Sequence, residues 1–229
     1  MTSLQAIIFD FDGVIADSEP LHLRAFQRTL GEIGLELSAA DYFGTYLGYD
    51  DVGVFEALGR HTGTPFTGEQ VRDLVTRKGV HLQQLTGAGD ALFPGAFDFI
   101  RAAAARIPVA IASGALRPEI DEVLTAAGLA SLFPVIVASG DTPQSKPSPA
   151  PYDLAYRQLQ QATGRPLDRR RCVAIEDSRW GLESARGAGL RCVGVTNSYP
   201  AHELPGAELI TGGLADLTLD ALDQLCSQP

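Results

Sequence analysis

The chain has 229 residues, 45% of them hydrophobic, which is enough for one large domain or for a domain that carries an insertion. Its 18 basic and 28 acidic residues leave a net charge of -10, which argues against general binding to nucleic acid or to an anionic membrane, although a few local donors could still hold an anionic substrate. The three cysteines lack metal-ligand spacing, and no signal peptide or membrane-spanning run is recognisable, so we expect a cytoplasmic monomer with its cysteines in the core.

The first predicted element is a short buried strand, Ala6 to Phe9, which is directly followed by two acidic residues. Asp10 and Asp12 stand where the strand ends, and Gly13 then breaks the extended pattern. Ligands of an open parallel sheet bind at the carboxyl ends of its strands. Two carboxylates this close repel each other unless a cation or a shared proton intervenes, and Mg2+ with oxygen ligands suits such a place. The alternative is an acidic turn without function.

The segment after this strand lacks strand patterns and is predicted to be helical. Apolar residues recur at helical spacing, and the expected helices cover residues 20–33, 50–60 and 68–84. We therefore expect a small helical domain at residues 17–90, inserted into a core domain formed by residues 1–16 and 91–229.

From about residue 107 onward, strand-like and helical segments alternate. Strands are expected at residues 108–113, 134–139, 172–177, 192–197 and, more weakly, 208–211; helices are expected at residues 117–127, 151–163, 180–188 and 216–225. Such alternation is typical of parallel strands joined by right-handed crossovers. The fold class predicted is therefore α/β, a doubly wound parallel sheet with an inserted helical domain.

Three further strand ends carry polar groups. Ser113 and Gly114 offer a hydroxyl and an exposed amide, Lys146 lies in a loop stiffened by prolines, and Glu176 with Asp177 ends another buried strand. Each has an ordinary explanation as a turn, a solvated charge or a helix cap with a solvated glutamate. Together with Asp10 and Asp12, however, they would gather at one edge of the sheet.

These motifs, in this order, closely resemble the haloacid dehalogenase superfamily over essentially the whole chain. DFDGVIADS (residues 10–18) looks like its first motif, Ser113–Gly114 its second, the Lys146 loop its third and Glu176–Asp177 its fourth. Residues 17–90 look like the helical cap of the family. DSEPLH (17–22) and GLESARGAG (181–189) are similar to the beta-phosphoglucomutase-like branch, which includes many phosphatases of small molecules. Ala150 stands where this branch often has an acidic residue.

The resemblance implies a role for each core residue. Asp10 would be the nucleophile that forms an aspartyl-phosphate, and Asp12 the general acid and base. Mg2+ would be held by Asp10, the backbone carbonyl of Asp12 and Asp177, with Glu176 orienting this shell directly or through water. The phosphoryl oxygens would be bound by Ser113, Gly114 and Lys146. Substrate selection by the cap would fall to Glu19, His22, Gly48, Tyr49 and Lys78.

Other functions fit the residues less well. Dehalogenases of the superfamily lack the second aspartate, Asp12; phosphorylatable receivers lack a long insertion; and a dinucleotide-binding turn would need glycines that are missing here. A phosphomutase needs the same core, but it commonly holds a second phosphate with a cap arginine. Residues 47–51 contain Asp50 and Asp51 and no arginine. We predict a phosphatase that acts on a small phosphorylated metabolite such as a sugar phosphate, with a phosphomutase as the alternative.

Overall fold

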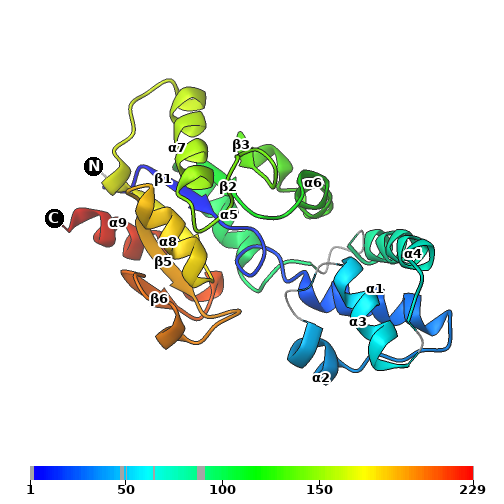
Figure 1. Ribbon diagram of the computed structural model, residues 1–229. Coiled ribbons are helices and arrows are strands. Elements are labelled where there is room, and N and C mark those ends of the chain that lie inside the picture. Colours follow the sequence, from blue (N-terminus) through cyan, green and yellow to red (C-terminus); the bar gives the residue numbers. More distant parts are fainter. Residues whose placement is uncertain (1–2, 47–48, 50, 64, 87–90, 229) are drawn as a thin grey trace. The chain divides into compact units, whose positions relative to one another are not determined.

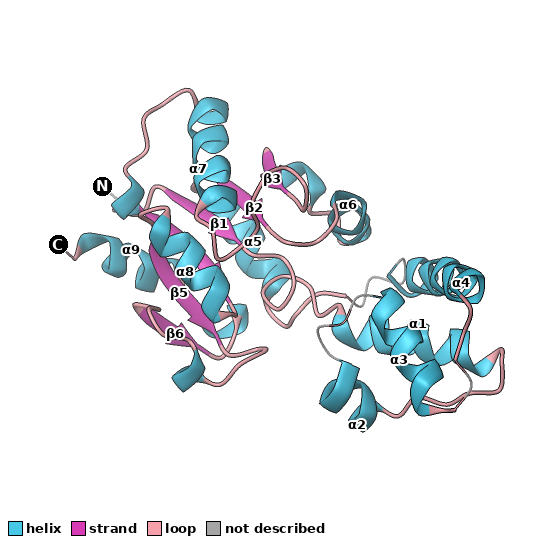
Figure 2. Ribbon diagram, viewed as in Figure 1, coloured by secondary structure: helices cyan, strands magenta, loops and turns pink. Residues whose placement is uncertain are grey.

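The computed structural model describes residues 3–46, 49, 51–63, 65–86 and 91–228. The chain divides into two compact units: Met1–Asp17 with Ala91–Pro229, and Ser18–Asp90. The first unit is an α/β unit and the second is helical (Figures 1 and 2). Among the described residues, no helix has the length and apolar character needed to cross a bilayer.

The α/β unit is built on a six-stranded parallel sheet with the order β3-β2-β1-β4-β5-β6. The strands are β1 (Ala6–Phe9), β2 (Val109–Ala112), β3 (Val135–Val137), β4 (Cys172–Glu176), β5 (Arg191–Val195) and β6 (Leu209–Thr211). The sequence places β1 first, yet β1 lies in the interior of the sheet, between β2 and β4. The prediction of a doubly wound parallel sheet is confirmed.

Helices cover both faces of the sheet because successive strand residues point to opposite sides. Ala6 and Ile8 face the core formed with α7 (Ala150–Thr163) and α8 (Arg179–Gly187). Phe9 points the other way and meets Phe99 of α5 (Ala96–Ala104) edge to face, with ring centroids 6.2 Å apart. The remaining helical segments of this unit are α6 (Arg117–Ala126), α9 (Leu219–Ser227) and the short 3-10 turns Ala130–Leu132, Arg169–Arg171, Ala201–Glu203 and Leu214–Asp216.

The structure differs from the prediction at two helices. The helix α5 is not among the predicted elements, although its buried residues Ala96, Phe99, Ile100 and Ala103 follow helical spacing. The last helix begins at Leu219 rather than at residue 216, because the Thr218 side chain accepts the Ala221 amide and caps the helix there. All three cysteines are buried and free, as the sequence predicts.

The helical unit has a hydrophobic core of its own. Its main helices are α1 (Glu19–Gly31), α3 (Asp51–His61) and α4 (Gly68–Thr86). Between α1 and α3 lie the short α2 (Ala39–Asp41) and a π-helical turn, Tyr42–Tyr46, neither of which was predicted. Phe26 of α1 lies at the centre of this core, 5.2 Å from the Phe55 ring and 5.8 Å from the Tyr42 ring. The unit therefore buries apolar surface independently of the sheet.

Candidate active site

The ends of three strands bring the predicted polar residues to one edge of the sheet. The Asp10 amide donates to the Ile175 carbonyl at 2.9 Å, and the Ser113 amide donates to the Val137 carbonyl at 2.9 Å. Both bonds continue the parallel ladder just past the last strand residue, so the backbone is held where the side chains leave the sheet. Asp10, Ser113 and Glu176 therefore start from fixed positions at the carboxyl edge.

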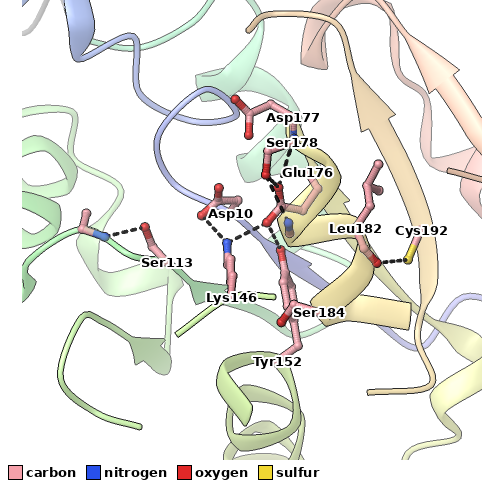
Figure 3. Close-up of polar contacts among 12 residues, drawn as sticks. Asp10, Ser113, Lys146, Tyr152, Glu176, Asp177, Ser178, Leu182, Ser184 and Cys192 are labelled. Atoms are coloured by element: carbon pink, nitrogen blue, oxygen red, sulfur yellow. Dashed lines mark hydrogen bonds and ion pairs between the residues drawn. The ribbon is translucent and has the colours of Figure 1, made fainter. Parts of the chain in front are cut away.

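Lys146 is not a solvated charge but the cation at the centre of this group (Figure 3). Its ammonium lies 2.8 Å from Asp10 Oδ1 and 2.6 Å from Glu176 Oε1, with its side chain only 13% exposed. The buried Asp10 Oδ1 contacts this ammonium as an ion pair and accepts no other hydrogen bond among the described residues. The buried Asp10 carboxylate can therefore still accept a further hydrogen bond or bind a cation.

The Glu176 carboxylate is completely buried and surrounded by donors. Besides Lys146, Oε1 accepts the Tyr152 hydroxyl at 3.0 Å. Oε2 accepts the amides of Asp177 and Ser178 at 3.2 and 3.3 Å, and the Ser178 hydroxyl at 3.1 Å. The expected alternative of a serine cap is half right: Ser178 caps α8 by accepting the Gly181 amide at 3.1 Å, but Glu176 is not solvated.

Asp177 lies next to the turn that follows β1. The turn is closed by three amides, of Val14, Ile15 and Ala16, that donate to the Phe11 carbonyl. Gly13 within it has φ 75°, and a Cβ there would lie 1.9 Å from Asp177 Oδ2. Asn197 donates to the Gly13 carbonyl at 2.8 Å. Glycine at this position is therefore needed both for the backbone conformation and for the room that Asp177 occupies.

Burial dominates the electrostatics of the site. Burial, aided by repulsion from Glu176, raises the pKa of Asp10 well above its usual value, while Lys146 opposes this shift. Burial and Glu176 also raise the pKa of Asp177 to about 6. Burial alone would lower the pKa of the Lys146 ammonium, but Asp10 and Glu176 together raise it above its ordinary value. Three carboxylates facing one ammonium leave excess negative charge that only a cation or protons can balance.

The residues present fit a divalent cation. Among the described residues, Asp10, Glu176 and Asp177 form a group in which one carboxylate oxygen of each lies within 4.8 Å of the others. Oxygen donors of this kind are those that Mg2+ prefers. The free acceptor capacity of Asp10 and the excess negative charge support the same conclusion.

The other predicted core residues lie close by but contribute differently. Asp12 is half-buried in the turn after β1, paired with Ala16 through an isolated bridge, and its carboxylate is not part of the group of three. The Ser113 hydroxyl accepts the Ala115 amide at 3.0 Å, so its hydrogen can still be donated. Gly114 is exposed at the same turn.

Within the helical unit, two of the predicted residues meet. The Lys78 ammonium, 1% exposed, lies 2.9 Å from His22 Nδ1 and donates to both Asp51 oxygens at 2.8 and 3.0 Å. Burial and the Lys78 charge lower the pKa of His22 to about 4. Glu19 instead accepts the Tyr42 hydroxyl at 2.9 Å, and Tyr49 is 54% exposed. Gly48 and Asp50 lie outside the described residues.

Sequence reasoning gave no structural role to three residues, although two of them, Gly181 and Asp51, lie in segments that it named. Tyr152 and Gly181 both contact or make room for Glu176, and Asp51 neutralises Lys78. A Cβ at Gly181 would lie 1.8 Å from Glu176 Oε1. Tyr152 follows the predicted third motif by only a few residues, and Gly181 is the first residue of the GLESARGAG segment, so position in or beside a motif was an available signal.

Comparisons with known proteins agree on one family. The family model of the haloacid dehalogenase-like hydrolases matches residues 4–189. Protein CbbY of Cereibacter sphaeroides is 33% identical over 95% of this chain and 98% of its own length, and the phosphoglycolate phosphatase of Yersinia pseudotuberculosis is 29% identical over 86% of this chain and 83% of its own.

A solved structure extends the similarity to the fold. The crystal structure of CbbY from Rhodobacter sphaeroides in complex with phosphate matches with a TM-score of 0.75 and 32% identity, over 96% of this chain and 99% of that one. A mutant of the same protein has been solved in complex with xylulose-1,5-bisphosphate, with a TM-score of 0.75, 31% identity and the same coverage of both chains.

Proposed function

The chain belongs to the haloacid dehalogenase-like hydrolase family, and from that premise we propose that it is a Mg2+-dependent phosphatase that hydrolyses a small phosphorylated metabolite through an aspartyl-phosphate. The observation that carries the proposal is the placement of Asp10, whose buried oxygen keeps acceptor capacity while Lys146 stands 2.8 Å away. A carboxylate is a weak nucleophile, so it needs alignment and a neighbouring positive charge to attack a phosphate.

Two displacements at phosphorus make up the proposed reaction. In the first, Asp10 forms a bond to phosphorus as the bond to the substrate oxygen breaks, and Asp12 gives its proton to the departing alcohol. In the second, Asp12 takes a proton from water, the resulting hydroxide attacks phosphorus, and the bond to Asp10 breaks to release inorganic phosphate. The same residue thus serves as acid and then as base.

The remaining groups hold the phosphoryl oxygens. Ser113 offers a hydroxyl and Gly114 an exposed amide at the turn after β2, and Lys146 supplies the positive charge between the phosphoryl group and Asp10. Mg2+, when bound, would supply further positive charge and polarise a phosphoryl oxygen. Asp10, Asp177 and the backbone carbonyl of Asp12 would hold it.

We further propose that the helical unit, Ser18–Asp90, is a cap that selects the leaving group. Glu19, His22, Gly48, Tyr49 and Lys78 are the residues proposed to do so. The three N–H donors of the Lys78 ammonium are directed at Asp51 and His22, so few remain to bind a second phosphate of the substrate. That pairing supports water, rather than a sugar hydroxyl, as the acceptor. The monomeric state and the cytoplasmic location stay predictions.

A sugar phosphate is the proposed substrate class. It is supported by the sugar bisphosphate held by the CbbY mutant, while the phosphoglycolate phosphatase among the relatives supports phosphatase activity on a small metabolite. The test is a panel of phosphomonoesters assayed for inorganic phosphate, including xylulose-1,5-bisphosphate, 2-phosphoglycolate and beta-glucose 1-phosphate. We expect phosphate release that requires Mg2+ and is silenced by EDTA. Conversion of glucose 1-phosphate to glucose 6-phosphate with little phosphate released would contradict the proposal.

A further inference from the structure

The Glu176 carboxylate accepts hydrogen bonds at both of its oxygens. It accepts five donors, two at Oε1 and three at Oε2, whereas a carboxylate offers about four lone-pair positions. Asp10 differs, because among the described residues its Oδ1 has the Lys146 ammonium as its polar contact and accepts no further hydrogen bond. Glu176 therefore acts on the site through the groups that it holds, above all through Lys146.

Tyr152 contacts both members of the Lys146–Glu176 pair. Its hydroxyl donates to Glu176 Oε1 at 3.0 Å, and the Lys146 ammonium lies 5.1 Å from the centre of its ring. Tyr152 is completely buried in α7, and burial followed by the charges of Glu176 and Asp10 raises its pKa well above the usual value. The hydroxyl is therefore a permanent donor aimed at one carboxylate oxygen (Figure 3).

Lys146 divides its charge between two carboxylates. Its ammonium lies 2.6 Å from Glu176 Oε1 and 2.8 Å from Asp10 Oδ1, so any rotation of the Glu176 carboxylate moves the cation relative to Asp10. The Tyr152 hydroxyl shares Oε1 with Lys146 and so restricts that rotation. On the other side, Gly181 leaves room for the carboxylate that a Cβ would fill.

We propose that Tyr152 is a positioning residue of the active site: its hydroxyl fixes the Glu176 carboxylate, which in turn fixes the Lys146 ammonium against Asp10. Tyr152 touches no reacting atom and acts only through these two side chains. The proposal rests on the proposed phosphatase function, which supplies the reaction that Lys146 serves.

The test is Tyr152→Phe, which keeps the ring beside Lys146 and removes only the hydroxyl. With an aryl phosphate and saturating Mg2+, we expect kcat to fall about tenfold, since a hydrogen bond to a charged group is lost. The affinity for inorganic phosphate, measured by calorimetry with Mg2+ present, should weaken about fivefold because Lys146 is displaced. A hydroxyl with a merely structural role would leave both values unchanged.

Tyr156→Phe is the matched control. Tyr156 lies one turn further along α7, and its buried hydroxyl donates to the Leu167 carbonyl, away from the site. This variant should lose comparable stability while kcat stays within about twofold of the wild type. If Tyr152→Phe behaves in the same way as Tyr156→Phe, the proposal is wrong.

Two further measurements keep the test decisive. A double-mutant cycle of Tyr152→Phe and Glu176→Gln, read as free energy of unfolding, should be non-additive if the hydroxyl acts on this carboxylate; additive effects contradict the proposal. Gly181→Ala should displace Glu176 and lower kcat at least tenfold, whereas Gly187→Ala in the same helix, whose Cβ would lie 3.2 Å from Pro149, should not. If the wild-type chain releases no phosphate, the proposed function fails, and the cycle still tests the Tyr152–Glu176 contact.

Discussion

Lys78 and Asp51 form an ion pair of which only one partner is fully buried. The Lys78 side chain is 1% exposed, and its ammonium lies 2.8 Å from Asp51 Oδ1, but the Asp51 side chain is 33% exposed. Lys78 also lies 4.9 Å from the centre of the Phe26 ring, inside the core of the helical unit. Removal of one partner therefore has a different consequence from removal of the other.

Asp51→Ala should destabilise the protein more than Lys78→Met. Without Asp51, the buried ammonium keeps His22 as its one polar partner among the described residues, and we expect the free energy of unfolding to fall by about 2–4 kcal/mol. Without Lys78, the Asp51 carboxylate can turn to water and methionine fills the apolar space, so the free energy of unfolding should fall by only about 1 kcal/mol. Urea unfolding measures both, with Arg77→Met on the exposed side of the same helix as control. Equal losses would contradict the asymmetry.

His22 should make the protein sensitive to acid. Its pKa is lowered to about 4 in the folded chain from the usual value of 6.5, because burial and the Lys78 charge oppose protonation, although Asp51 favours it. Between these values the unfolded chain binds the proton and the folded chain does not, so the free energy of unfolding falls as pH falls from about 6.5 to about 4. The loss from this group should be about 3 kcal/mol by pH 4.

His22→Gln should remove this part of the acid loss. Urea unfolding at pH 7 and pH 4.5 compares the variant with the wild type, whose stability advantage should shrink at the lower pH. His202→Gln, at a side chain that is 80% exposed in the other unit, is the control and should leave the acid loss in place. An advantage that is the same at both pH values would show that His22 does not resist protonation.

Gly13→Ala should be far more damaging than Gly128→Ala. Both glycines have positive φ, 75° and 68°, so each alanine costs about 1–2 kcal/mol in backbone strain. A Cβ at Gly128 meets nothing within 4 Å, whereas a Cβ at Gly13 would lie 1.9 Å from Asp177 Oδ2. We expect Gly13→Ala to lower the free energy of unfolding by several kcal/mol in total. If Mg2+ raises the melting temperature of the wild type, it should no longer do so in this variant. The prediction fails if the two variants unfold at the same urea concentration.

Asp10→Asn and Asp12→Asn should separate the two proposed catalytic roles. Asp10→Asn should abolish phosphate release while the far-UV circular dichroism stays that of the wild type, because the amide cannot form the aspartyl-phosphate. Asp12→Asn should lower kcat by ~10²–10⁴-fold, the usual contribution of a general acid and base. Steady-state kinetics with an aryl phosphate measures both. Full activity of Asp10→Asn would rule out the mechanism.

The sequence alone was sufficient for the sheet and for the expectation that polar residues gather at the ends of its strands. All six strands form where apolar runs predicted them, and Asp10, Ser113 and Glu176 stand at or just beyond strand ends. These features are local, since a run of apolar residues and the polar residue that ends it are neighbours in the chain. The helix α5 carried a local signal as well, in the spacing of Phe99, Ile100 and Ala103, but it was overlooked.

Only the tertiary structure decided which side chains meet. Tyr152 and Glu176 are 24 residues apart and Lys78 and Asp51 are 27 apart, on different elements in each case. No local pattern shows that a tyrosine of α7 will reach a carboxylate at the end of β4, or that Lys78, a candidate for substrate selection, will be buried beside Asp51. Such contacts depend on how a helix is rotated and packed against its neighbours, and packing of side chains from distant segments determines that rotation.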